Sequence, residues 1–225
     1  MMLKLAIYDL DKTITRRATF LPFLRYAVPR LAPWRVVLLP LMLGPLTAYG
    51  FKQIDRGRLK ELNLQLMLGS RMNGPRLAAV ARGFAGRTLS GNVLRGALDQ
   101  IAADKAAGAR VVIASASCAF YVAEIGKLLG INEVIGTRLV SAAGDILPKI
   151  VGENCYGPAK LRMIEAWLSD QGITRTDVQI RFYSDHVTDA PCLEWADEAF
   201  ATNAHAPLRV LATERGWVCY DWVGA

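Results

Sequence analysis

The chain alternates between short apolar runs and longer stretches in which apolar residues recur with helical spacing. The apolar runs predict buried strands, which we place at residues 3–8, 110–114 and 178–183. The helical spacing predicts helices, which we place at residues 92–107, 120–129 and 159–169. Strands that alternate with helices build a parallel sheet that is covered on both faces. We therefore expect an α/β fold with a Rossmann-like, three-layer parallel sheet.

A long stretch with helical character interrupts this alternation directly after the first strand. We expect an inserted helical cap, residues 16–87, on a core formed by residues 1–15 and 88–225. The 225 residues fit one such core plus an insertion, since single hydrophobic cores stop growing at about 250–300 residues. Residues 139–147 add a predicted β-hairpin, because Gly144 and its neighbours separate two runs that are typical of strands.

Polar residues suited to bind phosphate or metal follow each predicted strand. Asp9 and Asp11 come directly after the first strand, and Ser115 follows the second. Asp185 and Asp189 follow the third. The carboxyl ends of parallel strands meet at one edge of the sheet, where open α/β folds bind their ligands. Two carboxylates that lie close together repel each other unless a cation or a shared proton relieves them, so the pattern predicts a charged reaction site.

These motifs, together with a lysine at the start of a predicted helix, resemble those of the haloacid dehalogenase-like hydrolases, in the phosphoserine-phosphatase-like branch with a helical cap. The resemblance covers nearly the whole chain. It implies that Asp9 is a nucleophile that forms an aspartyl-phosphate, and that Asp11 is the general acid and base. It also implies that Lys160 balances the negative charge. Mg²⁺, which prefers a few carboxylate oxygens, would be bound by Asp9, by the backbone carbonyl of Asp11, by Asp185, and by Asp189 directly or through water.

The resemblance also implies a phosphate-binding group. Ser115 is expected to bind phosphate, and we add Ala116 and Thr13 as candidates. Asn154 is expected to hydrogen-bond the phosphate or leaving group, or else to hold its own loop, and the hydroxyl of Thr13 is also expected to bond its own loop. Asp11 favours a phosphate ester over a carbon–halogen substrate, because only an alkoxide leaving group needs a proton.

The charge of the chain is concentrated in the insertion. Residues 16–76 have eleven arginines and lysines against two acidic residues, a net charge of +9, whereas the whole chain has +7. The uncharged run 36–51 is too short to span a bilayer and contains two prolines. Trp34 and Tyr49 lie near its ends, as is typical of interface residues. We expect peripheral membrane contact through residues 20–60, and the alternatives are a buried cap helix or a dimer contact.

The insertion also bears on the substrate. Residues 20–26 and 57–58 resemble the cap of bacterial phosphatidylglycerophosphatase C, which implies a membrane lipid phosphate such as phosphatidylglycerophosphate. Phosphoserine phosphatases place an acidic residue seven positions after the second aspartate, but this chain has Ala18 there. The alternatives are a small soluble metabolite, such as a phosphoserine-like compound, and a vestigial membrane- or partner-binding module. Nucleic-acid binding is not expected, because the basic residues are interleaved with Leu, Val and Pro.

The cysteines and the position of the first motif bear on localisation. The four cysteines lie far apart and, with two histidines, give no zinc-binding spacing, which is typical of a reducing compartment. A cleavable signal peptide would have to remove Asp9. We therefore expect a cytoplasmic protein, peripheral to the inner membrane, that binds a phosphorylated substrate. The sequence does not predict the oligomeric state.

Overall fold

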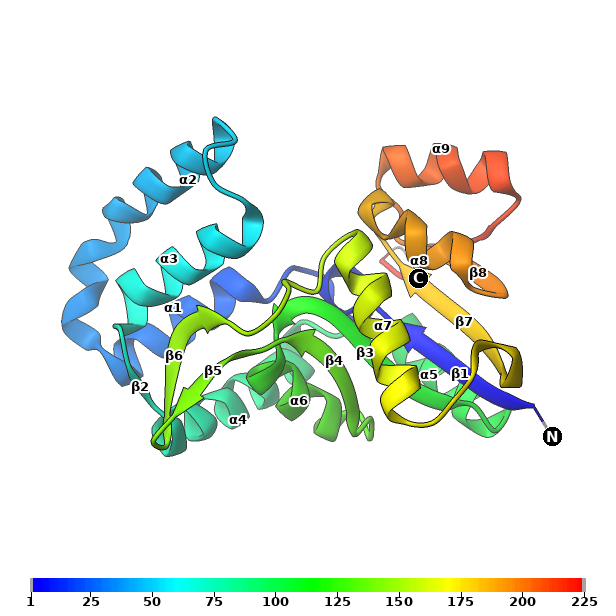
Figure 1. The fold of residues 1–225 in the computed structure, drawn as a ribbon, viewed down its shortest axis with the longest axis horizontal. Coiled ribbons are helices and arrows are strands. Elements are labelled where there is room, and N and C mark those ends of the chain that lie inside the picture. The colour runs from blue at the N-terminus through cyan, green and yellow to red at the C-terminus, as the bar shows by residue number, and fades with distance from the viewer. Residues whose placement is uncertain (1, 224–225) are drawn as a thin grey trace.

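A computed structural model describes residues 2–223 and shows a six-stranded parallel sheet at the centre of the molecule (Figure 1). All neighbouring strands in it are parallel. The predicted α/β fold is confirmed, and the second predicted strand runs further than expected, through Ser115. The order across the sheet is β4 (Glu133–Thr137), β3 (Arg110–Cys118), β1 (Leu3–Tyr8), β7 (Val178–Ser184), β8 (Glu198–Thr202) and β9 (Val218–Tyr220).

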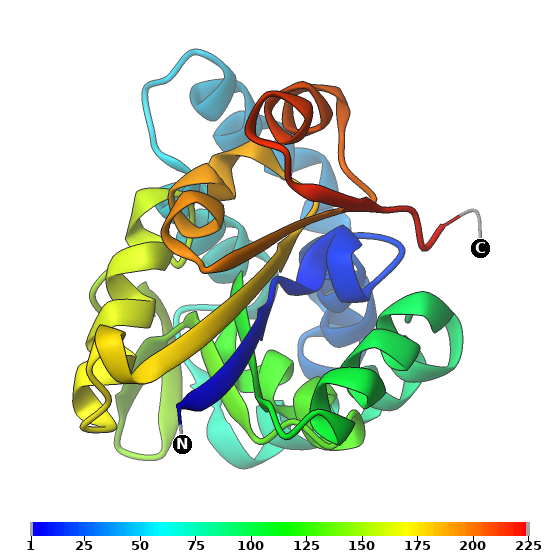
Figure 2. The same ribbon diagram turned by 90° about the vertical axis from the view of Figure 1, so that its right-hand side faces the viewer.

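Helices cover both faces of this sheet, because successive strand residues point to opposite sides. Leu5 and Ile7 of β1 belong to one apolar cluster, and Ala6 and Tyr8 belong to another. Figure 2 shows the sheet between the two groups of helices, so the predicted three-layer arrangement is confirmed. The first cluster includes α7 (Pro158–Asp170), α8 (Ala190–Trp195) and α9 (Ala206–Arg215), and the second includes α5 (Arg95–Ala106) and α6 (Ala119–Leu128).

The insertion is helical, as predicted, and lies at the end of the molecule opposite to α8 and α9 (Figure 1). Its last helix, α4, packs against α6 of the core and continues past residue 87. The division into a core (1–15 and 88–225) and a cap (16–87) therefore remains a proposal. The insertion contains α1 (Phe20–Leu31), a 3-10 segment (Pro33–Met42), α2 (Leu43–Gly50), α3 (Arg56–Leu68), β2 (Met72–Asn73) and α4 (Gly74–Gly91).

A small antiparallel sheet joins the insertion to the core. The predicted hairpin is present as β5 (Leu139–Ala142) and β6 (Asp145–Ile150). The sequence did not predict that β2 would pair with it, with Met72 opposite Ile146. This pairing fixes the end of the insertion to the core.

The apolar segment 33–51, which contains the 3-10 segment and α2, lies on the surface. None of its residues is buried. Val37, Leu43 and Phe51 are exposed by 75%, 63% and 79%. This excludes the alternative of a buried cap helix and leaves contact with a membrane or with a second copy of the chain. Across residues 2–223, no helix combines the length and the apolar character needed to cross a bilayer.

Candidate active site

A buried lysine connects two of the predicted carboxylates at the carboxyl edge of the sheet. Asp9 follows β1, and its backbone N–H donates to the carbonyl of Tyr183 in β7 at 2.9 Å. Lys160, in the first turn of α7, donates from Nζ to Asp9 Oδ1 at 2.8 Å and to Asp189 Oδ2 at 2.6 Å. Ser184 donates to the same oxygen of Asp189 at 2.7 Å. The fold thus brings together residues that are up to 180 positions apart in the sequence.

The local backbone explains how Lys160 reaches this edge. Gly157 has a φ of 58°, a left-handed conformation that glycine adopts without a steric penalty. Pro158 then begins α7, a position where proline costs no hydrogen bond. Lys160 follows two residues later with its side chain only 2% exposed. The loop and the helix start therefore determine where the amine lies.

The pKa shifts show how the charges of this edge interact. Burial works against the charged form of Lys160, but the carboxylates of Asp189 and Asp9 outweigh it and hold the pKa of Lys160 above its ordinary value. Burial raises the pKa of Asp9 to about 8, although Lys160 opposes the change. Burial and the neighbouring Asp189 raise the pKa of Asp185 to about 7. Three buried carboxylates thus share one amine, so their full ionisation would leave an excess of negative charge, and the raised pKa values of Asp9 and Asp185 reflect this.

This excess bears on the predicted Mg²⁺ site. In residues 2–223, no three acidic, histidine or cysteine side chains are grouped as a set of metal ligands, and Lys160 bridges Asp9 and Asp189. The donor chemistry nevertheless fits Mg²⁺, because the carboxylates of Asp9 and Asp185 are hard oxygen ligands in a buried, negatively charged place. Asp189 is already bonded to Lys160 and Ser184. The ligand set of Asp9, Asp11, Asp185 and Asp189 stays a prediction.

The carboxylate of Asp11 faces the insertion. Its Oδ1 accepts hydrogen bonds from the backbone N–H and the hydroxyl of Thr19, at 2.8 and 2.7 Å. Its Oδ2 accepts from the hydroxyl of Ser117 at 2.8 Å. Lys12, which follows Asp11, has a φ of 64° and turns the chain sharply. Asp9 therefore contacts Lys160 inside the core, whereas Asp11 lies where β3 meets the start of α1.

Three of the residues that are predicted to bind phosphate, Ser115, Ala116 and Asn154, make hydrogen bonds within the protein. Ser115 is fully buried, and its hydroxyl oxygen accepts from the backbone N–H of Ser117 at 3.1 Å. The carbonyl of Ala116 and the side-chain oxygen of Asn154 both accept from the hydroxyl of Thr137, at 2.8 and 3.0 Å. Asn154 thus contacts the end of β4 in this structure. Its contact with phosphate stays a prediction.

Thr13 does not make the contact that was predicted with its own loop. Its hydroxyl is buried and has no hydrogen-bond partner in the described part of the chain. Thr15 holds the loop instead, because its hydroxyl donates to the carbonyl of Leu10 at 3.0 Å. A threonine two residues further on has the geometry to reach back over the tight turn. A phosphate contact through Thr13 stays a prediction.

Lys60 is a site residue that the sequence analysis missed. It lies in α3 of the insertion, is buried, and donates from Nζ to the carbonyl of Ala116 and to Asn154 Oδ1, the latter at 2.5 Å. Burial and the neighbouring Arg56 lower the pKa of Lys60. A signal was present, since helical spacing places Lys60 on the same face as the buried Leu64 and Met67. Ser117 and Thr19 were missed as well.

An apolar cavity opens beside Asp11. Its volume is about 580 Å³, within the range of roughly 300–1,000 Å³ that is typical of small-molecule sites. Most of its wall comes from apolar residues of the insertion. It is lined by Asp11, Ala18, Phe20, Leu21, Pro22, Leu39, Met42, Leu43, Leu46, Tyr49, Arg56, Leu59, Lys60, Asn63, Ala116 and Ser117.

Comparisons with known proteins agree with this arrangement. A probable phosphatase of Mycobacterium tuberculosis is 31% identical over 223 residues, which cover 94% of this chain and 73% of the relative. The solved structure of a Bordetella pertussis protein of unknown function has a TM-score of 0.87 at 23% identity, and covers 99% of this chain and 100% of that one. A substrate-bound phosphoserine phosphatase has a TM-score of 0.62 at 16% identity, with 98% and 93% covered. Both structures show that the fold is shared.

The family model gives the most direct comparison. The model of the haloacid dehalogenase-like hydrolases matches residues 6–194. The matched range begins in β1, contains Asp9, Asp11 and Lys160, and ends after Asp189. The likeness of the insertion to phosphatidylglycerophosphatase C stays a prediction. The motifs, the fold and the family model agree, and this chain belongs to the haloacid dehalogenase-like hydrolases.

Proposed function

We propose that this hydrolase is a phosphatase that cleaves phosphate monoesters through a covalent intermediate on Asp9. The contact of Lys160 with Asp9 supports this proposal, because a buried ammonium stabilises the negative charge that gathers when a carboxylate meets a phosphate. A carboxylate oxygen of Asp9 bonds to phosphorus as the ester P–O bond breaks. Water then attacks the aspartyl-phosphate, which releases inorganic phosphate and restores Asp9.

We assign the proton transfers of both steps to Asp11. In the first step it gives a proton to the leaving alkoxide, and in the second it takes one from the attacking water. Asp11 lines the apolar cavity, which would hold the leaving group. Mg²⁺, held by Asp9, Asp185 and the backbone carbonyl of Asp11, would shield the negative charge of the phosphate.

The cavity beside Asp11 favours a substrate with an apolar leaving group. Among the described residues that line it, Asp11 is the only acidic one, and Ala18 occupies the position where phosphoserine phosphatases have an acidic residue that holds the ammonium group of the substrate. Arg56 and Lys60 supply positive charge on the same wall. This combination disfavours an amino-acid substrate and suits an amphipathic anion. The proposed substrate is a membrane lipid phosphate such as phosphatidylglycerophosphate.

The apolar segment 33–51 connects this cavity with the outside of the molecule. Leu39, Leu43 and Leu46 of the segment line the cavity, while Val37 is 75% exposed. A bilayer that covered the exposed side of the segment would therefore lie next to residues that line the cavity. Basic residues near an anionic surface add about 1 kcal/mol each. We extend the proposal to peripheral membrane contact through residues 20–60.

A substrate panel tests the proposed function. Purified protein with Mg²⁺ is expected to hydrolyse phosphatidylglycerophosphate in detergent micelles with a kcat/KM at least about tenfold above that for phosphoserine, and removal of the metal with EDTA should stop turnover. Leu46→Trp should fill the cavity and reduce hydrolysis of the lipid, while p-nitrophenyl phosphate is still hydrolysed. Leu128→Trp, at an exposed position of α6, is the matched control.

Two results would overturn parts of the proposal. If soluble esters are hydrolysed and the lipid phosphate is untouched, the protein is a phosphatase of small metabolites. If no phosphate ester is hydrolysed with Mg²⁺ present, the phosphatase assignment itself fails. An equal effect of Leu46→Trp on both substrates would show that the cavity does not select the lipid.

A further inference from the structure

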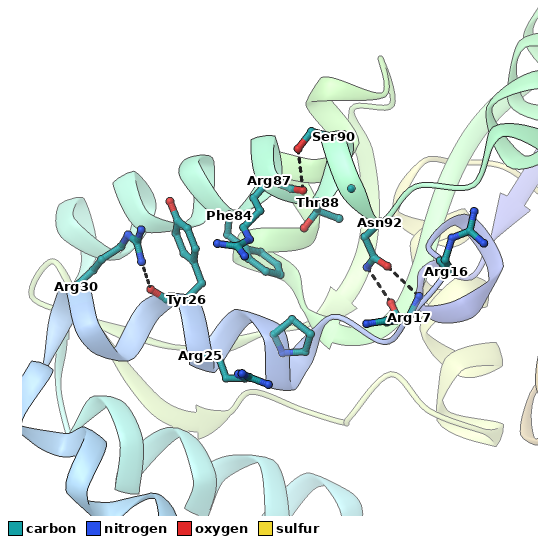
Figure 3. Close-up of a pocket in the computed structure, with 12 residues that line it drawn as sticks. Arg16, Arg17, Arg25, Tyr26, Arg30, Phe84, Arg87, Thr88, Ser90 and Asn92 are labelled. Atoms are coloured by element: carbon teal, nitrogen blue, oxygen red, sulfur yellow. Dashed lines mark hydrogen bonds between the residues drawn. The ribbon is translucent and has the colours of Figure 1, made fainter.

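A second hollow, with a volume of about 810 Å³, lies on the insertion between α1, α4 and the loop that precedes α1 (Figure 3). Five of its lining residues are arginines, and none of the described lining residues is acidic. We call this surface the arginine groove. Figure 3 shows its arginines on three segments around one hollow: Arg25 and Arg30 from α1, Arg87 from α4, and Arg16 and Arg17 from the loop.

The walls of the arginine groove are held together. The side chain of Asn92, just after α4, accepts from the backbone N–H of Arg17 at 3.0 Å and donates to its carbonyl at 3.0 Å. The backbone N–H of Arg16 donates to the carbonyl of Asn92 at 2.7 Å. Phe23 of α1 and Phe84 of α4 pack edge to face, with ring centroids 5.3 Å apart. The arginines therefore project from fixed elements, as a preorganised site requires.

None of the five guanidinium groups has an acidic partner among the described residues. No carboxylate in residues 2–223 forms an ion pair with Arg16, Arg17, Arg25 or Arg87. Arg30 lies over the ring of Tyr26, 3.7 Å from its centroid. Like charges that share a hollow repel each other, and a bound anion relieves this repulsion.

Several exposed arginines outside the groove do have a carboxylate partner. Arg58 pairs with Glu61, and Arg215 pairs with Glu194 at 3.1 Å. Arg162 is likewise bonded to Glu153. Arg76 and Arg82 of α4 are also exposed and have no carboxylate partner in residues 2–223, but they do not line the hollow. What distinguishes the arginine groove is that five arginines without such a partner line one hollow. The concentration of unpaired guanidinium groups in the arginine groove therefore points to a ligand from outside the chain.

We propose that the arginine groove binds phosphate anions, carried by an anionic phospholipid head group or by a free polyphosphate. Guanidinium groups bind phosphate oxygens through two parallel hydrogen bonds, which makes arginine the preferred residue for this anion. The hollow is larger than one phosphate, so the ligand has several phosphate groups or a phosphate with its substituents. The groove is separate from the active site, although Pro22 lines both it and the apolar cavity. The inference does not depend on the proposed substrate.

Two charge-matched double variants test this site. Arg25→Gln with Arg87→Gln removes two cations from the groove, whereas Arg76→Gln with Arg82→Gln removes two exposed cations of α4 that do not line it. Binding is measured by calorimetry with inorganic pyrophosphate. It is also measured by co-sedimentation with vesicles of 70% phosphatidylcholine and 30% phosphatidylglycerol, and with vesicles of phosphatidylcholine alone. Hydrolysis of p-nitrophenyl phosphate by each variant monitors the fold.

The groove variant is expected to lose about tenfold or more in affinity for at least one anionic probe, while the control variant changes less than about twofold. Loss with anionic vesicles alone identifies a lipid head group as the source, and loss with pyrophosphate alone identifies a free phosphate. Equal losses in both double variants would mean that net charge, and not the groove, binds the anion. The proposal would also be overturned if the unmodified protein bound neither pyrophosphate nor the anionic vesicles.

Discussion

Two regions of this molecule concentrate charge in opposite ways. Around Lys160, the carboxylates of Asp9 and Asp189 are buried and bonded to the amine within 2.8 Å. In the arginine groove, Arg25 and Arg87 are exposed and have no acidic partner among the described residues. The paired charges around Lys160 create an electrostatic field within the protein, and such a field can stabilise a reaction. The arginine groove needs an external anion, which is typical of a binding surface.

The apolar residues divide in the same way. In the core, side chains such as Ile7 and Phe182 are fully buried, whereas in the segment 33–51 Val37 and Leu41 are mostly exposed. Exposed apolar surface bordered by polar residues indicates an interaction site. The core therefore supplies the proposed chemistry, and the insertion supplies the proposed contacts with substrate and surroundings.

The largest expected effect comes from removing the proposed nucleophile. Asp9→Asn should lower kcat for p-nitrophenyl phosphate by at least about 10³-fold, because an amide does not attack phosphorus. The shape of the side chain is retained, so circular dichroism should show an intact fold. Asp99→Asn, at an exposed position of α5, is the control and should retain full activity. Residual turnover above about a tenth would show that the charged edge of the core is not the reaction centre.

Lys160→Met sharpens the comparison of the two charged regions, because the same kind of change can be made in the arginine groove. Loss of the buried amine leaves Asp9 and Asp189 without their partner and should lower the free energy of unfolding by about 3–5 kcal/mol. The rate should fall by about 10²–10³-fold. Arg25→Met should change stability by less than about 0.5 kcal/mol, because no ion pair is lost. Urea denaturation at pH 7 measures the stability of both variants. Similar losses of stability would contradict the distinction between a paired charge in the core and an unpaired charge in the arginine groove.

A third test concerns the apolar segment. Val37→Glu with Leu41→Glu, at two exposed positions that do not line the cavity, should weaken binding to vesicles of 70% phosphatidylcholine and 30% phosphatidylglycerol by about 10–100-fold, since burying one aliphatic side chain contributes about 1.5–3 kcal/mol. Val210→Glu changes a similarly exposed valine on α9 and should leave binding unaltered. If the double variant binds vesicles normally but turns a dimer into a monomer in sedimentation velocity, the segment is a contact between copies of the chain.

The sequence predicted most of the core because the core depends on local patterns. The apolar run of β1 and the aspartates that follow it lie within a few residues of each other. The start of α7 is likewise encoded locally, by Gly157 and Pro158 just before Lys160. Motifs at the ends of parallel strands meet at one edge for topological reasons. The general place of the candidate site could therefore be predicted without side-chain coordinates.

The contacts of Asp11 and Lys60 could not be predicted in this way. Asp11 bonds to Ser117, 106 positions away, and Lys60 bonds to Ala116, 56 positions away. Such contacts depend on how the insertion packs on the core, and the local pattern does not encode it. The sequence also left open whether the segment 33–51 is exposed, because an apolar run of that length is compatible with a buried helix and with an exposed segment. The predicted contact through the hydroxyl of Thr13 was wrong because the tight turn at Lys12 brings Thr15 to the loop carbonyl.

The smallest expected effect concerns Lys60, which belongs to the insertion but is buried like Lys160 of the core. Its pKa is lowered from the ordinary value of 10.5 by burial. Between the lowered pKa and 10.5, the unfolded chain still binds the proton that the folded chain has released. By linkage, Lys60 then makes the folded state more stable as the pH rises through this window, by at most about 1.4 kcal/mol per pH unit. Lys60→Met removes this dependence.

The measurement is the difference in free energy of unfolding between the unmodified protein and Lys60→Met, from urea denaturation between about pH 7.5 and 10. The difference should move in favour of the unmodified protein as the pH rises. Lys127→Met is the control, because Lys127 is exposed and pairs with Glu124 on the surface. A difference for Lys60→Met that stays constant with pH would mean that Lys60 keeps an ordinary proton affinity. In that case the insertion contributes no desolvated charge to the candidate active site. Lys60 then resembles the exposed cations of the arginine groove in its proton affinity.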